Sequence, residues 1–253
     1  VTATPSPQTA VNAVPGWTAA FPPGVDVVAG KNTGLCEDHR IKWAIECAGG
    51  VDGKYVAELG PLDASHTYML HSAGASRIDA VEANRLAYLR CLIAKEVLSL
   101  NRARFHLGDC IGFLEETSRE FDLVVGSGVL YHMREPVRLL EAIASRTQQL
   151  FLWTHFVDHS MMPPEDPRWK SFTGRATKHE RFGLELTLHG RDYGAGTANV
   201  SFCGGPRIEP MWMERASILN VLEALGFSKI DIAFENPSKP AGPCFSLFAS
   251  RVA

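Results

Sequence analysis

The stretch YVAELGPLDASHT, residues 55–67, decides how the chain folds. An apolar run that contains one acid, Glu58, is followed by a single glycine, Gly60, and a short polar segment. This order is typical of a chain that leaves a buried strand, turns tightly and enters a helix, and nucleotide-type ligands usually bind at such turns. A dinucleotide turn carries three glycines as G-x-G-x-x-G, whereas the second and third positions here hold Leu62 and Ser65. The turn is therefore crowded where a diphosphate would have to approach the backbone.

Strand and helix patterns alternate from this stretch onward. Strands are predicted over residues 54–59, 76–81, 103–107, 121–126 and 149–156, with helices over 65–74, 84–100, 110–118 and 136–146. Asp63 or Ser65 is the expected cap of the first of these helices. A helix over 214–225 and strands over 228–235 and 244–251 complete the pattern, and the short loop between the last two strands requires antiparallel pairing. The sequence therefore predicts an α/β fold, a doubly wound and mainly parallel seven-stranded sheet whose last strand is antiparallel.

The second predicted helix shows the clearest periodicity. Leu86, Leu89, Ile93 and Val97 recur at spacings of three or four, which places them on one face.

Two segments do not follow the alternating pattern. We interpret residues 1–53 as an N-terminal tail, frayed up to about Gln8, and a lid that contains one helix near 37–48. Residues 157–212 are rich in Gly, Pro, His and Arg and contain two alternating segments, 183–190 and 198–204, that are typical of antiparallel strands. We interpret them as an insertion after strand five that caps the substrate site.

Composition limits the partners of the chain. The 253 residues carry a net charge of −3, from 25 basic and 28 acidic residues, without a block of Lys or Arg, which disfavours a nucleic-acid partner. No apolar run is long enough to span a bilayer, and the first residues do not read as a secretion signal. None of the six cysteines forms a C-x-x-C pair, so we expect reduced thiols in a cytoplasmic protein.

Three acids fall at the carboxyl ends of the predicted strands, where doubly wound sheets bind ligands. Glu82 lies about twenty residues beyond the turn, where an acid can accept both hydroxyls of a ribose. Asp109 could receive an adenine amino group or simply cap the next helix, and Glu58 could contact a ligand or bond the turn that follows it. A ligand with adenosine but no phosphate suits the crowded turn. S-adenosylmethionine fits, because acids and carbonyls suit its positive sulfur.

Several segments also resemble a known family. VAELGPLDASHT, IDAVEAN, GDC, FDLVVGSGVLYHMREP, GFSKIDIAF and CFSLFASR are similar to class I S-adenosylmethionine-dependent methyltransferases, over roughly residues 54–156 and 213–252. The resemblance implies a Rossmann-like methyltransferase domain over 54–253, with S-adenosylmethionine as cofactor and a small-molecule acceptor. The cofactor contacts that it implies are Glu58, Gly60, Pro61, Leu62, Glu82, Ala83, Asn84, Gly108, Asp109, Cys110, Ser127 and Gly128.

Two histidines are the candidates for catalysis. His132 follows the fourth strand in LYHMREP, and His155 lies at the end of the fifth in WTHFVDH. Either could act as general base for a hydroxyl or amine acceptor, because histidine titrates near neutrality. His155, Asp158 and His159 could also hold a divalent metal or form a polar wall, and we assign no metal site.

Other residues and functions stay open at this point. Trp212 is expected in the core and at a helix start, and His179 and His189 are expected in solvent. Trp17 and Trp43 could cover the cofactor or simply bury apolar area. The alternatives to methyl transfer are an NAD(P)-dependent oxidoreductase and a non-catalytic S-adenosylmethionine-binding protein. The acceptor and the oligomeric state are not predicted.

Overall fold

The computed structural model describes residues 3–194 and 209–251. Contacts divide this part of the chain into two compact units, one formed by the residues up to Phe113 and the other by those from Leu114 onward. A seven-stranded sheet has the order β3-β2-β1-β4-β5-β10-β9, and a separate three-stranded sheet has the order β6-β7-β8. Only β10 runs against its neighbours in the larger sheet. The predicted fold class, including the antiparallel last strand, is confirmed.

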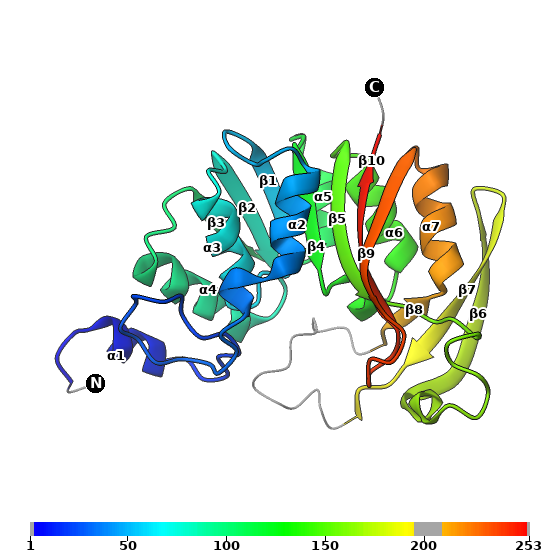
Figure 1. Cartoon of the computed structure of the whole chain (residues 1–253), viewed down its shortest axis with the longest axis horizontal. Helices are drawn as coiled ribbons and strands as arrows, with labels where there is room; N and C mark the ends of the chain where they lie inside the picture. Colours follow the sequence, from blue (N-terminus) through cyan, green and yellow to red (C-terminus); the bar gives the residue numbers. More distant parts are fainter. Residues whose placement is uncertain (1–2, 195–208, 252–253) are drawn as a thin grey trace. The chain divides into compact units, whose positions relative to one another are not determined.

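The first unit is built on three parallel strands. β1 (Tyr55–Leu59) pairs with β2 (Arg77–Glu82), and β2 pairs with β3 (Ala103–Leu107), as Figure 1 shows. Buried residues run almost without interruption along β1 and β2, as expected for strands covered on both faces. The helices of this unit are α1 (Pro7–Asn12), α2 (His39–Cys47), α3 (Ser65–Ser72), α4 (Arg85–Val97) and α5 (Cys110–Glu116), with a 3₁₀ turn, η1 (Leu35–Glu37). The helix expected near 37–48 is α2, whereas α1, capped by Ser6, was not predicted.

The buried face of α4 differs from the apolar row in its sequence. Ala87, Arg90, Cys91 and Ala94 are the buried residues, whereas Leu89 is 43% exposed. Three of these residues are small, and the fourth, Arg90, is held on the buried face by its ion pair with Asp63. The leucine periodicity therefore predicted the helix correctly but did not mark its buried face.

The second unit contains the other strands of the large sheet. β4 (Leu123–Ser127) pairs with β5 (Gln149–His155) in parallel, and β10 (Cys244–Ser250) lies antiparallel between β5 and β9 (Lys229–Asn236). The helices are α6 (Pro136–Ala144) and α7 (Arg215–Ala224), with the 3₁₀ turns η2 (Leu130–His132) and η3 (Pro167–Ser171). Pro136 occupies the first turn of α6, as expected, because that position needs no hydrogen-bonded N–H.

The insertion forms its own antiparallel sheet. It consists of β6 (Phe172–Arg181), β7 (Leu184–Arg191) and β8 (Met211–Met213), drawn in yellow-green, yellow and orange in Figure 1. β7 confirms the strand predicted over 183–190, β6 was not predicted, and the segment 198–204 lies outside the described residues. Trp212 is buried, as expected, but it lies in β8 rather than at a helix start. His179 is exposed as expected; the expectation for His189 is wrong, because its side chain lies against His159, Trp169 and Glu214 and is only 9% exposed.

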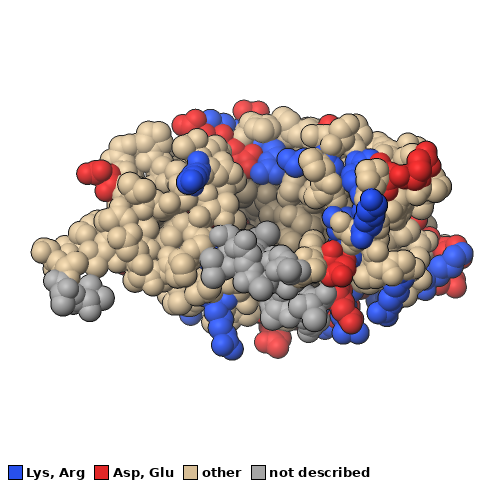
Figure 2. Space-filling view, turned by 90° about the horizontal axis from the view of Figure 1, so that it is seen from below, with Lys and Arg blue, Asp and Glu red and all other residues tan. Residues whose placement is uncertain are grey.

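The surface in Figure 2 carries scattered charges of both signs. Blue and red side chains are interspersed there, and most of this face carries neither. In this view there is no broad basic area of the kind that binds a phosphate backbone. Among the described helices, none combines the length and the apolar character needed to cross a bilayer.

Candidate functional site

The turn after β1 has an unusual backbone. Gly60 has a φ of 68°, and the left-handed conformation continues at Leu62 (φ 56°) and Ala64 (φ 62°). A side chain at such a φ costs about 1–2 kcal/mol, because its Cβ crowds the following carbonyl. The chain thus retains glycine-like geometry with a leucine at the second glycine position. Such strain is characteristic of functional turns.

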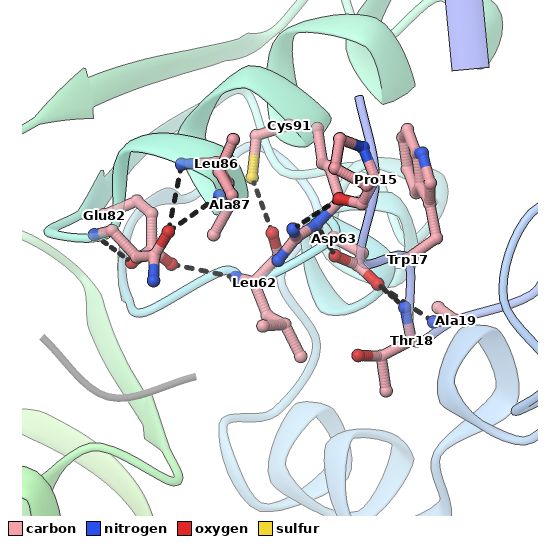
Figure 3. A network of polar contacts seen from close by, with 12 residues as sticks. Pro15, Trp17, Thr18, Ala19, Leu62, Asp63, Glu82, Leu86, Ala87 and Cys91 are labelled. Atoms are coloured by element: carbon pink, nitrogen blue, oxygen red, sulfur yellow. Dashed lines mark hydrogen bonds and ion pairs between the residues drawn. The ribbon is translucent and has the colours of Figure 1, made fainter. Parts of the chain in front are cut away.

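Three N–H groups of this turn are already used within the protein, and Figure 3 shows one of them, the N–H of Leu62. The N–H of Gly60 donates to a carbonyl of β2 (2.9 Å), that of Ala64 donates to the carbonyl of Pro61 (2.9 Å), and Pro61 itself has no N–H. The N–H of Leu62 donates to Oε2 of Glu82 at 3.1 Å. A group that a phosphate would need is therefore bound to a carboxylate.

Glu82 is buried at the end of β2, only 4% exposed. Its Oε1 accepts the N–H of Asn84 at 2.8 Å, and Asn84 in turn caps α4 by accepting the N–H groups of Leu86 and Ala87. Burial raises the pKa of Glu82 to about 7, although the backbone N–H groups oppose this shift. Each carboxylate oxygen can accept a second hydrogen bond. Glu82 can therefore receive hydroxyl groups such as those of a ribose.

Glu58 ends up with one unsatisfied oxygen. Its side chain is buried, and Oε2 accepts the hydroxyl of Thr67. Oε1 has no hydrogen-bond partner among the described residues, and burial raises the pKa of the carboxyl group. A buried polar atom without a partner is costly. Glu58 therefore offers an acceptor toward which a ligand can donate.

Asp63 fastens the N-terminal segment over the turn rather than capping α3. Arg90 donates from Nε to Oδ1 at 2.6 Å, and the N–H groups of Thr18 and Ala19 donate to Oδ2 at 2.6 and 2.9 Å (Figure 3). Arg90 also donates to the carbonyl of Pro15 at 3.1 Å. The predicted caps are therefore wrong, because α3 begins after Ala64 without a side-chain cap. The predicted lid is tied to the turn by a buried ion pair that sequence reasoning missed.

The remaining predicted residues of the first unit lie after β3. The N–H of Gly108 donates to the backbone carbonyl of Glu82 at 2.9 Å, which joins the ends of β3 and β2. Asp109 is exposed, and its side chain accepts the N–H of Ile111 at 3.3 Å. This contact is the helix-capping role that the sequence left open beside the contact with adenine. Burial raises the pKa of Cys110 to about 12, which suits an apolar wall. The first unit thus brings together the predicted contacts from Glu58 to Cys110 at the ends of β1–β3.

The predicted contacts of the second unit lie at the end of β4. Ser127 is the last residue of the strand, and Gly128 follows with a φ of 84°. A Cβ at Gly128 would lie 3.3 Å from the ring of Trp153, so glycine is favoured by both its conformation and its surroundings.

Both candidate catalytic histidines belong to an aromatic cluster of the second unit, made of Tyr131, His132, Trp153, His155, Tyr193 and Trp212. The ring of Tyr131 lies 4.3 Å from that of His132 and 4.8 Å from that of His155, between centroids. His155 stacks on Trp212 at 5.1 Å with an interplanar angle of 11°. The structure therefore brings His132 and His155 together around one tyrosine.

The tautomer of His155 follows from its hydrogen bonds. Its Nδ1 lies 2.8 Å from the carbonyl oxygen of Gly242 and 3.2 Å from that of Pro243, so Nδ1 carries the proton. Nε2 then holds a lone pair. Burial lowers the pKa of His155, and the nearby charge of Arg191 adds to this effect. Gly242 allows the close fit, because a Cβ there would lie 2.5 Å from the Trp212 ring.

His132 is also neutral near pH 7, because burial disfavours its protonated form. Burial lowers its pKa to about 4, with a further contribution from His155. Both histidines are therefore bases rather than acids near neutral pH.

Arg191 is a residue that sequence reasoning missed. It is only 7% exposed, and its guanidinium lies over the rings of Trp212 (4.5 Å) and Phe172 (4.7 Å). Its Nε and Nη1 have no hydrogen-bond partner in the described ranges, and residues 195–208 contain no acid. A lone arginine on an alternating strand gives no signal in sequence, because the cost of burying it depends on tertiary packing.

The run His155, Asp158 and His159 does not form one site. Asp158 accepts the N–H of Ser160 at 2.9 Å, and His155 bonds to backbone carbonyls. His159 instead lies near His189 and Glu214, which are remote in sequence.

Comparisons with known proteins place this geometry in context. Neither the family models nor the curated proteins give a match. The crystal structure of the N-terminal domain of EvdMO1 with SAH bound is similar at a TM-score of 0.71 and 22% identity, over 97% of this chain and 95% of that one. In the structure of EvdMO1 itself, at a TM-score of 0.62 and 20% identity, the match covers 96% of this chain and 46% of that one.

A second protein is similar in fold. Magnesium protoporphyrin IX methyltransferase (ChlM) from Synechocystis PCC 6803 with bound SAH matches at a TM-score of 0.54 and 19% identity, over 85% of this chain and 81% of that one. At such identities the likeness establishes the fold. The chain has the Rossmann-like fold of S-adenosylmethionine-dependent methyltransferases.

Proposed function

We propose that this protein transfers a methyl group from S-adenosylmethionine to a small-molecule acceptor. One observation carries the proposal: the Leu62 N–H at the position of the second glycine is bonded to the buried carboxylate of Glu82. The turn thereby presents a buried hydrogen-bond acceptor to the ligand where a dinucleotide-binding turn presents free N–H groups.

The hydrogen bonding of this turn discriminates between the candidate cofactors. NAD(P) brings a diphosphate, which finds the N–H of Leu62 already donated to Glu82. S-adenosylmethionine has no phosphate and carries a positive sulfonium, which a carboxylate attracts. We therefore favour methyl transfer over the oxidoreductase alternative.

The cofactor is assigned to the predicted residues by their chemistry. Glu82 has free lone pairs for ribose hydroxyls, and the unpartnered Oε1 of Glu58 can accept from a donor at the amino-acid end. Asp109 is exposed for an adenine amino group, beside the apolar Cys110. The structures of similar fold with bound SAH support S-adenosylmethionine as the cofactor.

His155 is the preferred general base. Its Nδ1–H is held by two carbonyls, and its lowered pKa keeps Nε2 unprotonated at neutral pH. Because the methyl group is already activated in the cofactor, the protein mainly aligns donor and acceptor and removes one proton. His132, with a pKa of about 4, is too weak a base to be equally effective.

The acceptor is assigned to a chemical class only. Aromatic rings around His155 suit a planar or sugar-like molecule, and the guanidinium of Arg191 suits an anionic or strongly accepting group on it. We assign residues 157–212 as the cap over this acceptor and residues 1–53 as a lid. A similar structure with bound 1,6-didemethyltoxoflavin supports a small-molecule acceptor. We also place the protein in the cytoplasm, on its predicted reduced thiols.

Ligand titration tests the proposal. Thermal unfolding with S-adenosylmethionine, SAH, NAD⁺, NADH and NADPH should show stabilisation by the first two alone, since a ligand that binds the folded state raises its stability. Saturation by a dinucleotide without a response to S-adenosylmethionine would establish the oxidoreductase alternative. Cofactor binding without transfer to any of a panel of phenols, sugars and carboxylates would favour the non-catalytic alternative.

A further inference from the structure

We propose that His159, His189 and Glu214 form a binding site for a transition-metal ion of the Zn²⁺ type in the second unit. The inference does not depend on methyl transfer. Nε2 of His189 lies 3.0 Å from Oε1 of Glu214, and Nε2 of His159 lies 3.8 Å from the same oxygen. The ligand atoms of all three lie within 4.8 Å of one another.

These distances fit a shared ion. Zinc binds imidazole nitrogens and carboxylate oxygens at about 2.0–2.2 Å with tetrahedral geometry, which separates neighbouring ligand atoms by about 3.4 Å. The two separations from Glu214 lie on either side of this value. The side chain of His159 is 62% exposed and can move the short distance that remains. Three protein ligands leave a fourth position for water.

The backbone holds the three ligands together from three segments. In the pairing of β7 with β8, His189 lies opposite Trp212. Glu214 follows Trp212 by two residues. Val157 precedes His159 by two residues. Its N–H donates to the carbonyl of Met213 at 2.9 Å, and its carbonyl accepts the N–H of Arg215, the residue after Glu214, at 2.9 Å. A metal ion would therefore crosslink the loop after β5 to β7 and to the start of α7.

Side-chain orientation supports the same site. Glu214 occupies the N-cap position of α7 but makes no capping hydrogen bond, so its carboxylate faces the histidines and not the helix end. The ring of His159 stacks on Trp169 at 5.4 Å and 22°, and the indole N–H of Trp169 donates to backbone carbonyls at 3.0 and 3.1 Å. Trp169 thereby orients the most exposed ligand.

The donor set selects the metal. Two imidazoles and one carboxylate suit Zn²⁺, Co²⁺, Ni²⁺ and Cu²⁺, whereas Mg²⁺ and Ca²⁺ prefer oxygen ligands. The open position could also admit an anionic ligand.

Metal titration of the tag-free chain tests the inference. After removal of metal by a chelator, calorimetry with Zn²⁺ should show one site per chain and the visible spectrum of added Co²⁺ should be tetrahedral, while Mg²⁺ should not bind there. His159→Ala and Glu214→Gln should each weaken Zn²⁺ binding by about tenfold or more, because a ligand is lost or uncharged. His179→Ala, which changes an exposed histidine of β6, is the matched control and should bind normally.

Two results would overturn the inference. One is the absence of Zn²⁺ binding to the wild-type chain at about 100 μM metal, a weak affinity for a site of this kind. The other is unchanged binding in either His159→Ala or Glu214→Gln. The His159 variant alters an exposed side chain, and its metal-free melting curve should match that of the wild type, which separates metal loss from misfolding.

Discussion

Replacing Glu82 with glutamine tests whether the raised pKa of this buried acid makes the stability of the protein depend on pH. The pKa of Glu82 lies at about 7 instead of 4.5, because burial disfavours the ionised form. At about 1.4 kcal/mol per pKa unit, ionisation of this side chain costs the folded state about 3 kcal/mol at high pH. A raised pKa gives stability that is present below pH 4.5 and is lost as the pH rises through about 7. The glutamine variant removes this loss.

The measured quantity is the difference in unfolding free energy between Glu82→Gln and the wild type. Glutamine also places an amide N–H₂ against one of the backbone N–H groups at 2.8 or 3.1 Å, which costs about 1–3 kcal/mol regardless of pH. From about pH 5 to about pH 8, the difference should therefore change by about 2.5 kcal/mol in favour of the variant. Comparison with the wild type at each pH removes the opposite contribution of His132, whose lowered pKa adds stability as the pH rises.

Urea unfolding at a series of pH values is the assay, with the exposed Glu116→Gln as control. A difference for Glu82→Gln that stays constant with pH would refute the reasoning, because Glu82 would then ionise normally when folded. A separate titration at about pH 8 tests the ribose contact: loss of hydrogen bonds to a charged acceptor should weaken S-adenosylmethionine binding by about 10–100-fold.

Three further changes test other parts of the structure. Asp63→Asn leaves the buried Arg90 without its ion pair and should lower the unfolding free energy, measured in urea, by about 3–5 kcal/mol. The double variant Asp63→Asn, Arg90→Met should recover much of this loss. A cost near zero for Asp63→Asn would contradict a stabilising role of the ion pair. His155→Asn keeps a donor for the Gly242 carbonyl but has no basic nitrogen, so kcat for a hydroxyl acceptor should fall by about 100-fold or more with an unchanged KM for the cofactor. In the wild type, kcat should fall only below about pH 6.5, because the pKa of His155 is lowered; equal turnover of the variant would remove its role. Arg191→Met should leave stability unchanged or higher while raising the acceptor KM by about tenfold, whereas a loss of more than about 2 kcal/mol in unfolding free energy would assign it a structural role.

The fold could be predicted because its signals are local. Near-continuous apolar strands, helices between them and a short last loop determine a mainly parallel sheet with one reversed strand, whatever the side chains contact. The acids Glu58, Glu82 and Asp109 could be placed for the same reason, since the end of a strand is visible in sequence.

The predictions that failed concern relations across distance in sequence. The periodicity of α4 did not mark its buried face, because that face carries three small residues and Arg90, whose partner Asp63 lies 27 residues earlier in the chain. His189 was expected in solvent, whereas its side chain lies against Glu214, His159 and Trp169, which are remote in sequence.

The sequence by itself determined the sheet, the edge at which its strand-end acids lie, and the absence of the second and third glycines from the turn after Gly60. Only the tertiary structure decided that Leu62 donates to Glu82, that Asp63 holds Arg90, and that His159 meets His189 and Glu214. The physical reason is that strand and turn propensities act over a few residues. Hydrogen bonds and buried charges depend on which remote segments the folded chain brings within about 3 Å.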